Sequence, residues 1–442
     1  MGSYVPSTPA QRREMLEAVG CASMEDLFGH LPRQILLDRP LHLPSGLSEL
    51  EVRRTVEKMA AHNTVFSTVL RGAGAYRHYI PAIVKQVVSK EEFVTAYTPY
   101  QAEISQGVLQ SIFEYQTMIC ELTGMDVSNA SVYDGATAAA EAVAMCRDRK
   151  RTKALISAAA HPDLIQTVKT YCEGAGTPVE IIPMKDGKTD LDKLFSLLDN
   201  SVSCVLLQQP NYYGLLEDAE TAAEAIHSAG AKYIMSCNPI SLGMLKTPAE
   251  YGADIAVGDG QPLGLSLSFG GPYLGFMACT NALLRKIPGR IVGETTDVDG
   301  KRAYVLTLQA REQHIRREKA SSNICSNQAL CALTASVYLA AMGAEGLQKA
   351  AEQSFAKAHY FAAKMSEIPD CQLRFTGEFF HEFVAQCPDV PKVMDALEQH
   401  GILGGLPLDG DFSGCVLWCV TEQNSKEEVD QAIAIIKEVC GA

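Results

Sequence analysis

Long apolar runs and an excess of basic charge are both absent from this sequence. No apolar run approaches the ~20 residues of a membrane-spanning helix. Residues 1–11 lack the basic-then-apolar pattern of a signal peptide. The 38 Lys and Arg residues are outnumbered by 52 Asp and Glu residues, for a net charge of −14, which argues against nucleic acid and membranes as partners. We therefore expect a cytoplasmic protein that meets small molecules or other proteins.

Several patterns that support metal binding or catalysis are missing as well. The 14 cysteines are spread singly through apolar stretches, where cysteine behaves as a small buried hydrophobe. Cys415 and Cys419 stand four apart in a predicted strand without a histidine or second thiol pair nearby, so we expect no metal site. No G-x-S-x-G elbow occurs, and no two carboxylates stand at a spacing useful for general acid–base work.

Apolar strands alternate with helices through the middle of the chain. This alternation is typical of a parallel sheet covered by helices on both faces. The predicted strands are 153–158, 179–184, 201–209, 231–237 and 254–257. The sequence therefore predicts an α/β fold with a mostly parallel sheet.

The pattern also predicts a division into parts. We expect a helical N-terminal arm at 1–62, a large α/β domain at 63–293, a connecting hairpin and helix at 294–320, and a small α+β domain at 321–442. The arm either wraps a neighbouring subunit or packs on its own domain.

The stretch 254–279 predicts a buried strand, a glycine-rich turn and a second strand. A polar turn beyond the C-terminal end of a strand is where α/β enzymes bind ligands. In fold-type-I pyridoxal-phosphate (PLP) enzymes such a turn carries the lysine that binds the cofactor, yet here it reads GDGQP, with no lysine. Lys246 precedes the strand in an acidic, solvated context, and nothing nearby would lower its pKa.

Polar loops supply the remaining candidates for a site. Gly135 to Thr137 begin a predicted helix, whose N–H groups either hold a phosphate or allow close packing. Asn211, at a strand end, either reaches a ligand or caps a turn. His161 begins a helix, and it either caps the helix or holds a hydrogen bond, which is the expectation, or acts as a base.

Two further stretches combine unusual residues. The loop TAYTPYQ is rich in tyrosine and poor in charge, which is typical of a pocket or a subunit contact; Tyr97, Tyr100 and Gln101 are candidates there from composition alone. Asn323 and Asn327 flank a cysteine ahead of a long apolar helix. Either they line a site or the segment is structural, with Ser326 as the N-cap.

Long strings in the chain resemble a known family. YTPYQAEISQG, NASVYDGATAAAEA, QQPNYYG, SFGGPYLGF and REKASSNICSNQALCALTASVYLAAMG are similar to the glycine decarboxylase family, the P-protein of the glycine cleavage system. The similarity is to subunit 1 of its split, two-subunit form, and it runs from about residue 5 to the C-terminus.

The resemblance implies a fold-type-I PLP-enzyme architecture and an obligate partner. Subunit 2 would carry PLP and form a heterodimer with this chain, and two heterodimers would pair. The complex would decarboxylate glycine, release CO2 and pass the aminomethyl group to the lipoyl arm of H-protein, with T- and L-proteins acting in the same system. PLP supplies the electron sink for such chemistry.

The chain departs from the cofactor-binding pattern at two places. The lysine position falls near Gln261 and Pro262, and the aspartate that would face the pyridinium nitrogen is replaced near Ser236 and Cys237. We therefore expect no covalently bound PLP, no catalytic residue in this chain, and no activity from it alone. The alternatives are a self-sufficient PLP enzyme with an unrecognised lysine and a non-enzymatic scaffold of the same fold.

Overall fold

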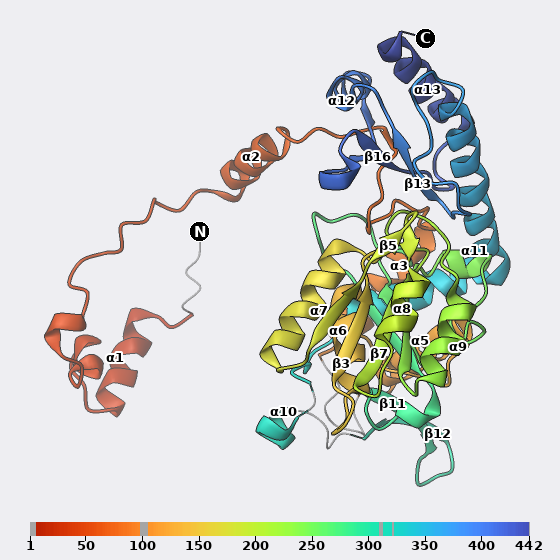
Figure 1. The fold of residues 1–442 in the computed structure, drawn as a ribbon. Coiled ribbons are helices and arrows are strands. Elements are labelled where there is room, and N and C mark those ends of the chain that lie inside the picture. Colours follow the sequence, from red (N-terminus) through yellow and green to blue (C-terminus); the bar gives the residue numbers. More distant parts are fainter. Residues whose placement is uncertain (1–5, 98–104, 309–312, 321, 442) are drawn as a thin grey trace. The chain divides into compact units, whose positions relative to one another are not determined.

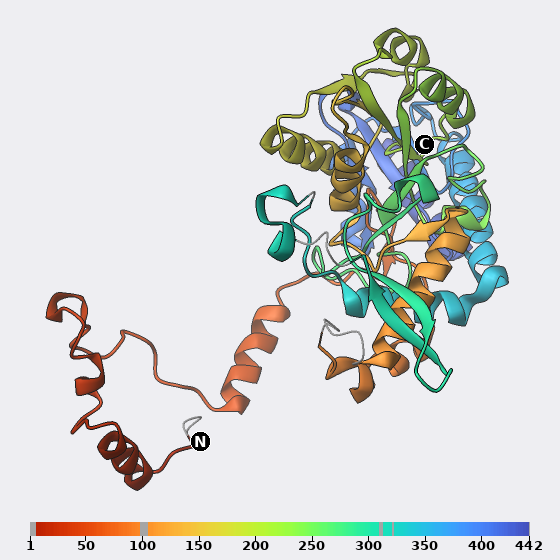
Figure 2. The ribbon, with the colours of Figure 1, turned by 90° about the horizontal axis from the view of Figure 1, so that it is seen from below.

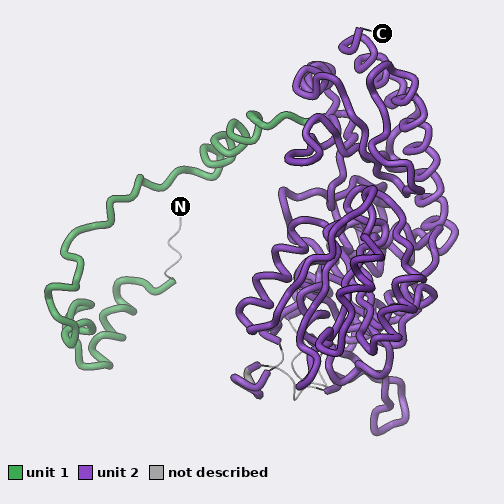
Figure 3. Tube along the Cα trace, in the orientation of Figure 1, with its two compact units in different colours: residues 1–65 green, residues 66–442 purple. Residues whose placement is uncertain are grey.

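The computed structural model describes residues 6–97, 105–308, 313–320 and 322–441 (Figure 1). Contacts divide the chain into two compact units, 1–65 and 66–442 (Figure 3). The first unit contains α1 (Pro9–Ala18), α2 (Glu49–Ala60) and two short 3-10 turns, Glu25–Phe28 and Arg33–Ile35. Capping boxes start both α-helices, from Thr8 with Gln11 and from Ser48 with Glu51. No described residue of this unit is buried.

A seven-stranded sheet forms the centre of the second unit, in the order β2-β10-β9-β8-β7-β3-β4. Its strands are β2 (Val127–Ser128), β3 (Lys153–Ser157), β4 (Val179–Ile182), β7 (Val202–Gln209), β8 (Lys232–Cys237), β9 (Ile255–Asp259) and β10 (Gly275–Cys279). The strands from β4 to β9 run parallel, and β10 is antiparallel to β9 and β2. The mostly parallel α/β sheet predicted from the sequence is confirmed.

Helices cover both faces of the sheet, which explains its continuous apolar strands. Along β7, Cys204 and Leu206 join one buried cluster while Val205 and Leu207 join the other. The first cluster is completed by α6 (Gly135–Cys146) and α7 (Pro162–Gly174). The second is completed by α5 (Gln106–Thr123), α8 (Leu191–Leu197), α9 (Ala219–Ser228) and α11 (Ala329–Met365).

The C-terminal part is built on a three-stranded antiparallel sheet, β13-β16-β15. Its elements are β13 (Glu382–Gln386), α12 (Val390–Gln399), β14 (Ile402–Leu403), β15 (Leu406–Pro407), β16 (Cys415–Cys419) and α13 (Lys426–Cys440). The fully buried Trp418 lies in its core. β14 pairs in parallel with β1 (Thr68–Val69), so the beginning of the second unit is hydrogen-bonded to the C-terminal part.

Short elements complete the fold. They are α3 (Ala82–Val88), α4 (Glu91–Val94), β5 (Met184–Lys185), β6 (Lys188–Thr189), the hairpin β11 (Ile291–Thr296) and β12 (Arg302–Thr307), and α10 (Gln313–Arg316). The hairpin extends away from the central sheet (Figure 2).

The element α11 joins two helices across a kink at Gly343, whose φ of 62° is left-handed and suits glycine. The sequence pattern indicates two consecutive helices here, and the kink agrees with that division. By length and composition alone α11 is apolar enough to cross a membrane, but 44% of its most apolar window is buried inside the protein. The core helix of a globular protein passes the same test of length and composition.

Candidate functional site

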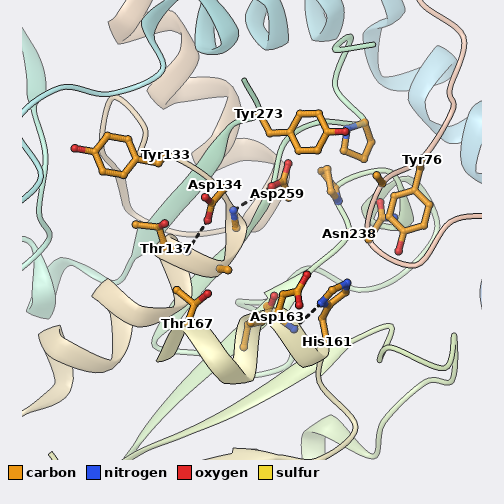
Figure 4. A pocket seen from close by; sticks show the side chains of 18 of the residues that line it. Tyr76, Tyr133, Asp134, Thr137, His161, Asp163, Thr167, Asn238, Asp259 and Tyr273 are labelled. Carbon is orange, nitrogen blue, oxygen red and sulfur yellow. Dashed lines mark hydrogen bonds between the residues drawn. The ribbon is translucent and has the colours of Figure 1, made fainter. Parts of the chain in front are cut away.

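A cleft of about 600 Å³ lies at the carboxyl ends of β7, β8 and β9 (Figure 4). The sheet contributes Gln208, Ser236, Cys237 and Asp259 to its lining. The starts of α6 and α7 and residues 73–76 form other walls. This is the edge at which α/β folds bind ligands, so the cleft is the candidate site.

Two carboxylates occupy the start of α6, where an anion would otherwise bind. Asp134 is the N-cap, and its Oδ1 accepts a hydrogen bond from the Thr137 N–H at 2.7 Å. Asp259 Oδ2 accepts from the Gly135 N–H at 3.1 Å (Figure 4). Burial raises the pKa of Asp259 to about 6, with a contribution from the charge of Asp134. The sequence predicts that the N–H groups at the start of α6 either hold a phosphate or allow close packing. In the structure, two of them donate to carboxylates of this chain.

The position expected for the cofactor lysine holds a structural clamp. Gln261 is 1% exposed. Its Oε1 accepts from the Tyr76 N–H at 2.8 Å, and its Nε2 donates to Tyr76 O at 2.9 Å and Leu265 O at 2.7 Å. Pro262 follows and lines the cleft. The Gln261 side chain is thus committed to backbone groups rather than to a ligand.

The place expected for an aspartate beside a pyridinium nitrogen carries neutral groups. Ser236 and Cys237 end β8 and line the cleft. The Cys237 thiol donates to Val257 O at 3.7 Å, and burial raises its pKa to about 12, so it remains protonated. Neither side chain can balance a protonated ring nitrogen.

Acidic side chains dominate the charge of the cleft. Asp134, Asp163 and Asp259 line it, and among the described residues no lysine or arginine does. His161 Nδ1 accepts from the Asp163 N–H, and its Nε2 lies 2.9 Å from Ala73 O. It caps α7, as expected. These residues do not fit PLP, because the cleft offers a phosphate no positive charge and an aldehyde no amine.

One strap of chain, residues 71–79, separates the cleft from a buried junction with the C-terminal sheet. On the junction side, Glu382 Oε1 accepts from the Ala73 N–H at 2.7 Å and Oε2 accepts from the Tyr76 hydroxyl at 2.8 Å. Burial raises the pKa of Glu382 to about 7. His78 Nδ1 contacts Glu422 Oε2 at 2.7 Å. The strap therefore links the cleft wall to the C-terminal part.

Comparison with known proteins identifies the family. The sequence model described as "Glycine cleavage system P-protein" matches residues 2–436. The chain belongs to this family. It is 50% identical over 442 residues to "Probable glycine dehydrogenase (decarboxylating) subunit 1" of Moorella thermoacetica, covering 99% of each chain. A protein with the same description from Carboxydothermus hydrogenoformans is 50% identical over 440 residues, covering 98% of this chain and 99% of the relative.

Solved structures agree with this membership of the P-protein family. A crystal structure of "glycine decarboxylase (P-protein) of the glycine cleavage system, in inhibitor-bound form" matches with a TM-score of 0.93 at 44% identity, covering 99% of this chain and 100% of the other. An alanine–glyoxylate aminotransferase from Nostoc matches with a TM-score of 0.59 at 17% identity, covering 92% of this chain and 98% of the other, and shows the shared fold alone. The fold-type-I architecture is thereby confirmed.

Three of the other predicted residues, Tyr97, Asn323 and Asn327, do not line the cleft of this P-protein family member. Tyr97 is exposed, whereas Tyr100 and Gln101 lie outside the described residues. Asn323 is exposed and lines a separate cavity of about 520 Å³. Asn327 Nδ2 donates to Ala130 O and Ser131 Oγ, both at 2.9 Å. The described members of this group do not converge on one site.

Three local expectations have a definite outcome. Asn211 is buried and accepts from the N–H groups of Tyr213 and Leu215, so it organises a turn. Lys246 is exposed and paired with Glu220, as expected for a solvated lysine. The Ser326 cap is wrong, because α11 begins at Ala329 with Gln328 as its N-cap.

Sequence reasoning missed Glu382 and the clamp at Gln261. A signal for Glu382 was available, since a single carboxylate stands among apolar residues in FFHEFVAQ. Charged residues are seldom fully buried unless they are paired. No local signal links Gln261 to Tyr76, which is 185 residues away.

Proposed function

We propose that this chain is subunit 1 of a two-subunit glycine dehydrogenase (decarboxylating) and that PLP is held by subunit 2. The observation that carries the proposal is the pair of carboxylates, Asp134 and Asp259, on the amides that begin α6. A phosphate monoester carries about −1.5 to −2 charge at pH 7. It would meet two acids there instead of open N–H donors. Gln261, clamped to backbone groups, removes the covalent anchor as well.

The complex then divides its work between the two chains. Subunit 2 supplies the PLP site for glycine decarboxylation, and lipoylated H-protein accepts the aminomethyl group. The T- and L-proteins act in the same system, in the cytoplasm. Within this chain we propose an arm at 1–62, a large domain at 63–293, a connection at 294–320 and a small domain at 321–442.

Unit 1 supports the need for a partner chain. Its apolar side chains remain outside any core, with Ile35 69%, Leu43 71% and Met59 66% exposed. Exposed apolar surface on this scale is typical of interaction sites. We propose that subunit 2 covers it, and that two heterodimers assemble.

Reconstitution tests the proposal. The purified chain, incubated with excess PLP, is expected to show no aldimine absorption and no lysine labelled after borohydride reduction. Mixing it with subunit 2 is expected to produce glycine–CO2 exchange that neither chain gives alone. A reduced PLP adduct on a lysine of this chain would establish the self-sufficient enzyme instead. Full glycine–CO2 exchange by subunit 2 alone would support the alternative that this chain is a non-enzymatic scaffold.

A further inference from the structure

Three cysteines meet in the C-terminal part, away from the cleft. Cys371 follows α11, Cys387 directly follows β13, and Cys440 is the last residue of α13. The Sγ atoms of Cys371 and Cys440 lie 3.9 Å apart. Cys371 is 0% exposed and Cys387 3% exposed, whereas Cys440 is partly exposed. The fold therefore brings a buried thiol and an accessible thiol into contact.

The surroundings favour ionisation of the buried thiol. Hydrogen bonds from the thiols of Cys387 and Cys440 lower the pKa of Cys371 to about 7. Burial and the neighbouring Cys371 raise the pKa of Cys440 to about 11. Because the thiolate is the nucleophile in disulfide exchange, Cys371 is suited to complete an exchange that begins at Cys440.

We propose that Cys371 and Cys440 form a reversible disulfide site that is oxidised by low-molecular-weight disulfides. Cys440 Sγ attacks one sulfur of the oxidant, breaks its S–S bond and forms a mixed disulfide, and the released thiolate takes the Cys440 proton. Cys371 Sγ then attacks Cys440 Sγ and displaces the second thiolate, which takes up a proton. The two cysteines lose two electrons, and the oxidant becomes two thiols.

The bond would close a loop that contains β13, α12, β16 and α13. A covalent link across a loop of this length restricts the unfolded chain strongly. We therefore expect oxidation to slow proteolysis within α13 by at least about tenfold where cleavage follows local opening. Reduction by dithiothreitol restores the original rate.

Peptide mapping of the full-length chain, alone and with subunit 2, tests the site. Treatment with oxidised glutathione followed by alkylation is expected to yield a Cys371–Cys440 cross-link and to remove two of the 14 thiols. Cys371→Ser should instead accumulate a stable glutathione adduct on Cys440. Cys440→Ser removes one of the two sulfurs and should abolish this cross-link. Cys325→Ser, which alters an exposed cysteine elsewhere, should leave the cross-link unchanged.

The same map defines the results that would overturn the proposal. A lasting adduct on Cys440 of the unaltered protein, without a cross-link, would show that Cys371 does not complete the exchange. A cross-link of Cys371 to Cys387 that survives Cys440→Ser would assign a different pair. Both readings come from protein that carries Cys371, so they stand even if Cys371→Ser does not fold.

Discussion

The cleft and the junction lie on either side of the same strap and differ in the setting of their carboxylates. In the cleft, Asp134, Asp163 and Asp259 face a shared space into which no described lysine or arginine projects. At the junction, both oxygens of the buried Glu382 accept hydrogen bonds from the strap. The contacts between the strap and the C-terminal part are therefore in place, whereas the described lining of the cleft offers no cation to a phosphate.

Removing the Gln261 clamp, which holds the strap at Tyr76, should have the largest effect on stability. Gln261→Ala leaves Tyr76 N, Tyr76 O and Leu265 O without this partner in a buried setting. We expect the free energy of unfolding to fall by about 3–5 kcal/mol, measured by urea denaturation. Gln328→Ala, a half-buried glutamine of the cleft lining, should cost less than about 1 kcal/mol. Equal losses of unfolding free energy in Gln261→Ala and Gln328→Ala would show that the clamp supports the fold no more than the cleft lining does.

The junction should also make stability depend on pH. The pKa of Glu382 is raised from 4.5 to about 7 by burial, so its contribution is full below pH 4.5 and is lost as pH rises through about 7. Over this window the unaltered protein should lose about 3 kcal/mol more than Glu382→Gln does. Denaturation at several pH values measures this difference. Parallel profiles for the two proteins would show that Glu382 titrates normally.

The cleft should tolerate change and gain affinity for anions. Asp259→Ala exposes the Gly135 N–H and removes a negative charge, so affinity for inorganic phosphate should rise about tenfold by calorimetry. Stability should change by about 1 kcal/mol or less. Asp163→Ala removes the same charge from the start of α7 and serves as the control. An equal gain in both variants would assign the effect to net charge rather than to the α6 amides.

The arm should give the smallest change in stability. Val56 on α2 is 57% exposed, and Val56→Asp should alter the unfolding free energy by less than about 0.5 kcal/mol. The affinity of the Val56→Asp protein for subunit 2 should nevertheless fall, and a titration by light scattering or calorimetry would measure this. Thr55→Asp adds the same charge at the neighbouring position. Unchanged affinity of Val56→Asp for subunit 2 would show that this side chain is not part of the proposed interface.

The regular parts of the fold could be predicted from local patterns. Strands such as β7 and β8 are apolar throughout because both of their faces are buried, and their alternation with helices indicates a parallel sheet. The absence of a lysine after β9 is likewise visible in the sequence alone. These features depend on residues that are near one another in the chain.

The details of the site could not be predicted because they depend on distant contacts. Gln261 meets Tyr76 across 185 residues, and Asp259 meets Gly135 across 124. The thiol pair Cys371 and Cys440 was hidden in the same way, since singly spread cysteines indicate only a buried core. Ser326 has the residue type of a cap, yet the helix begins three residues later.

The clamp at Gln261 also has an evolutionary consequence. Gln261→Lys alone would remove the amide that holds the backbone of Tyr76, and the new amine would still stand near a start of α6 filled by Asp134 and Asp259. The intermediate protein would lose stability without gaining a cofactor. Several simultaneous changes would be needed before any benefit arose. Under the proposed function, the structure of this chain therefore opposes the gain of a cofactor site by this chain and so preserves the division of labour between the two subunits.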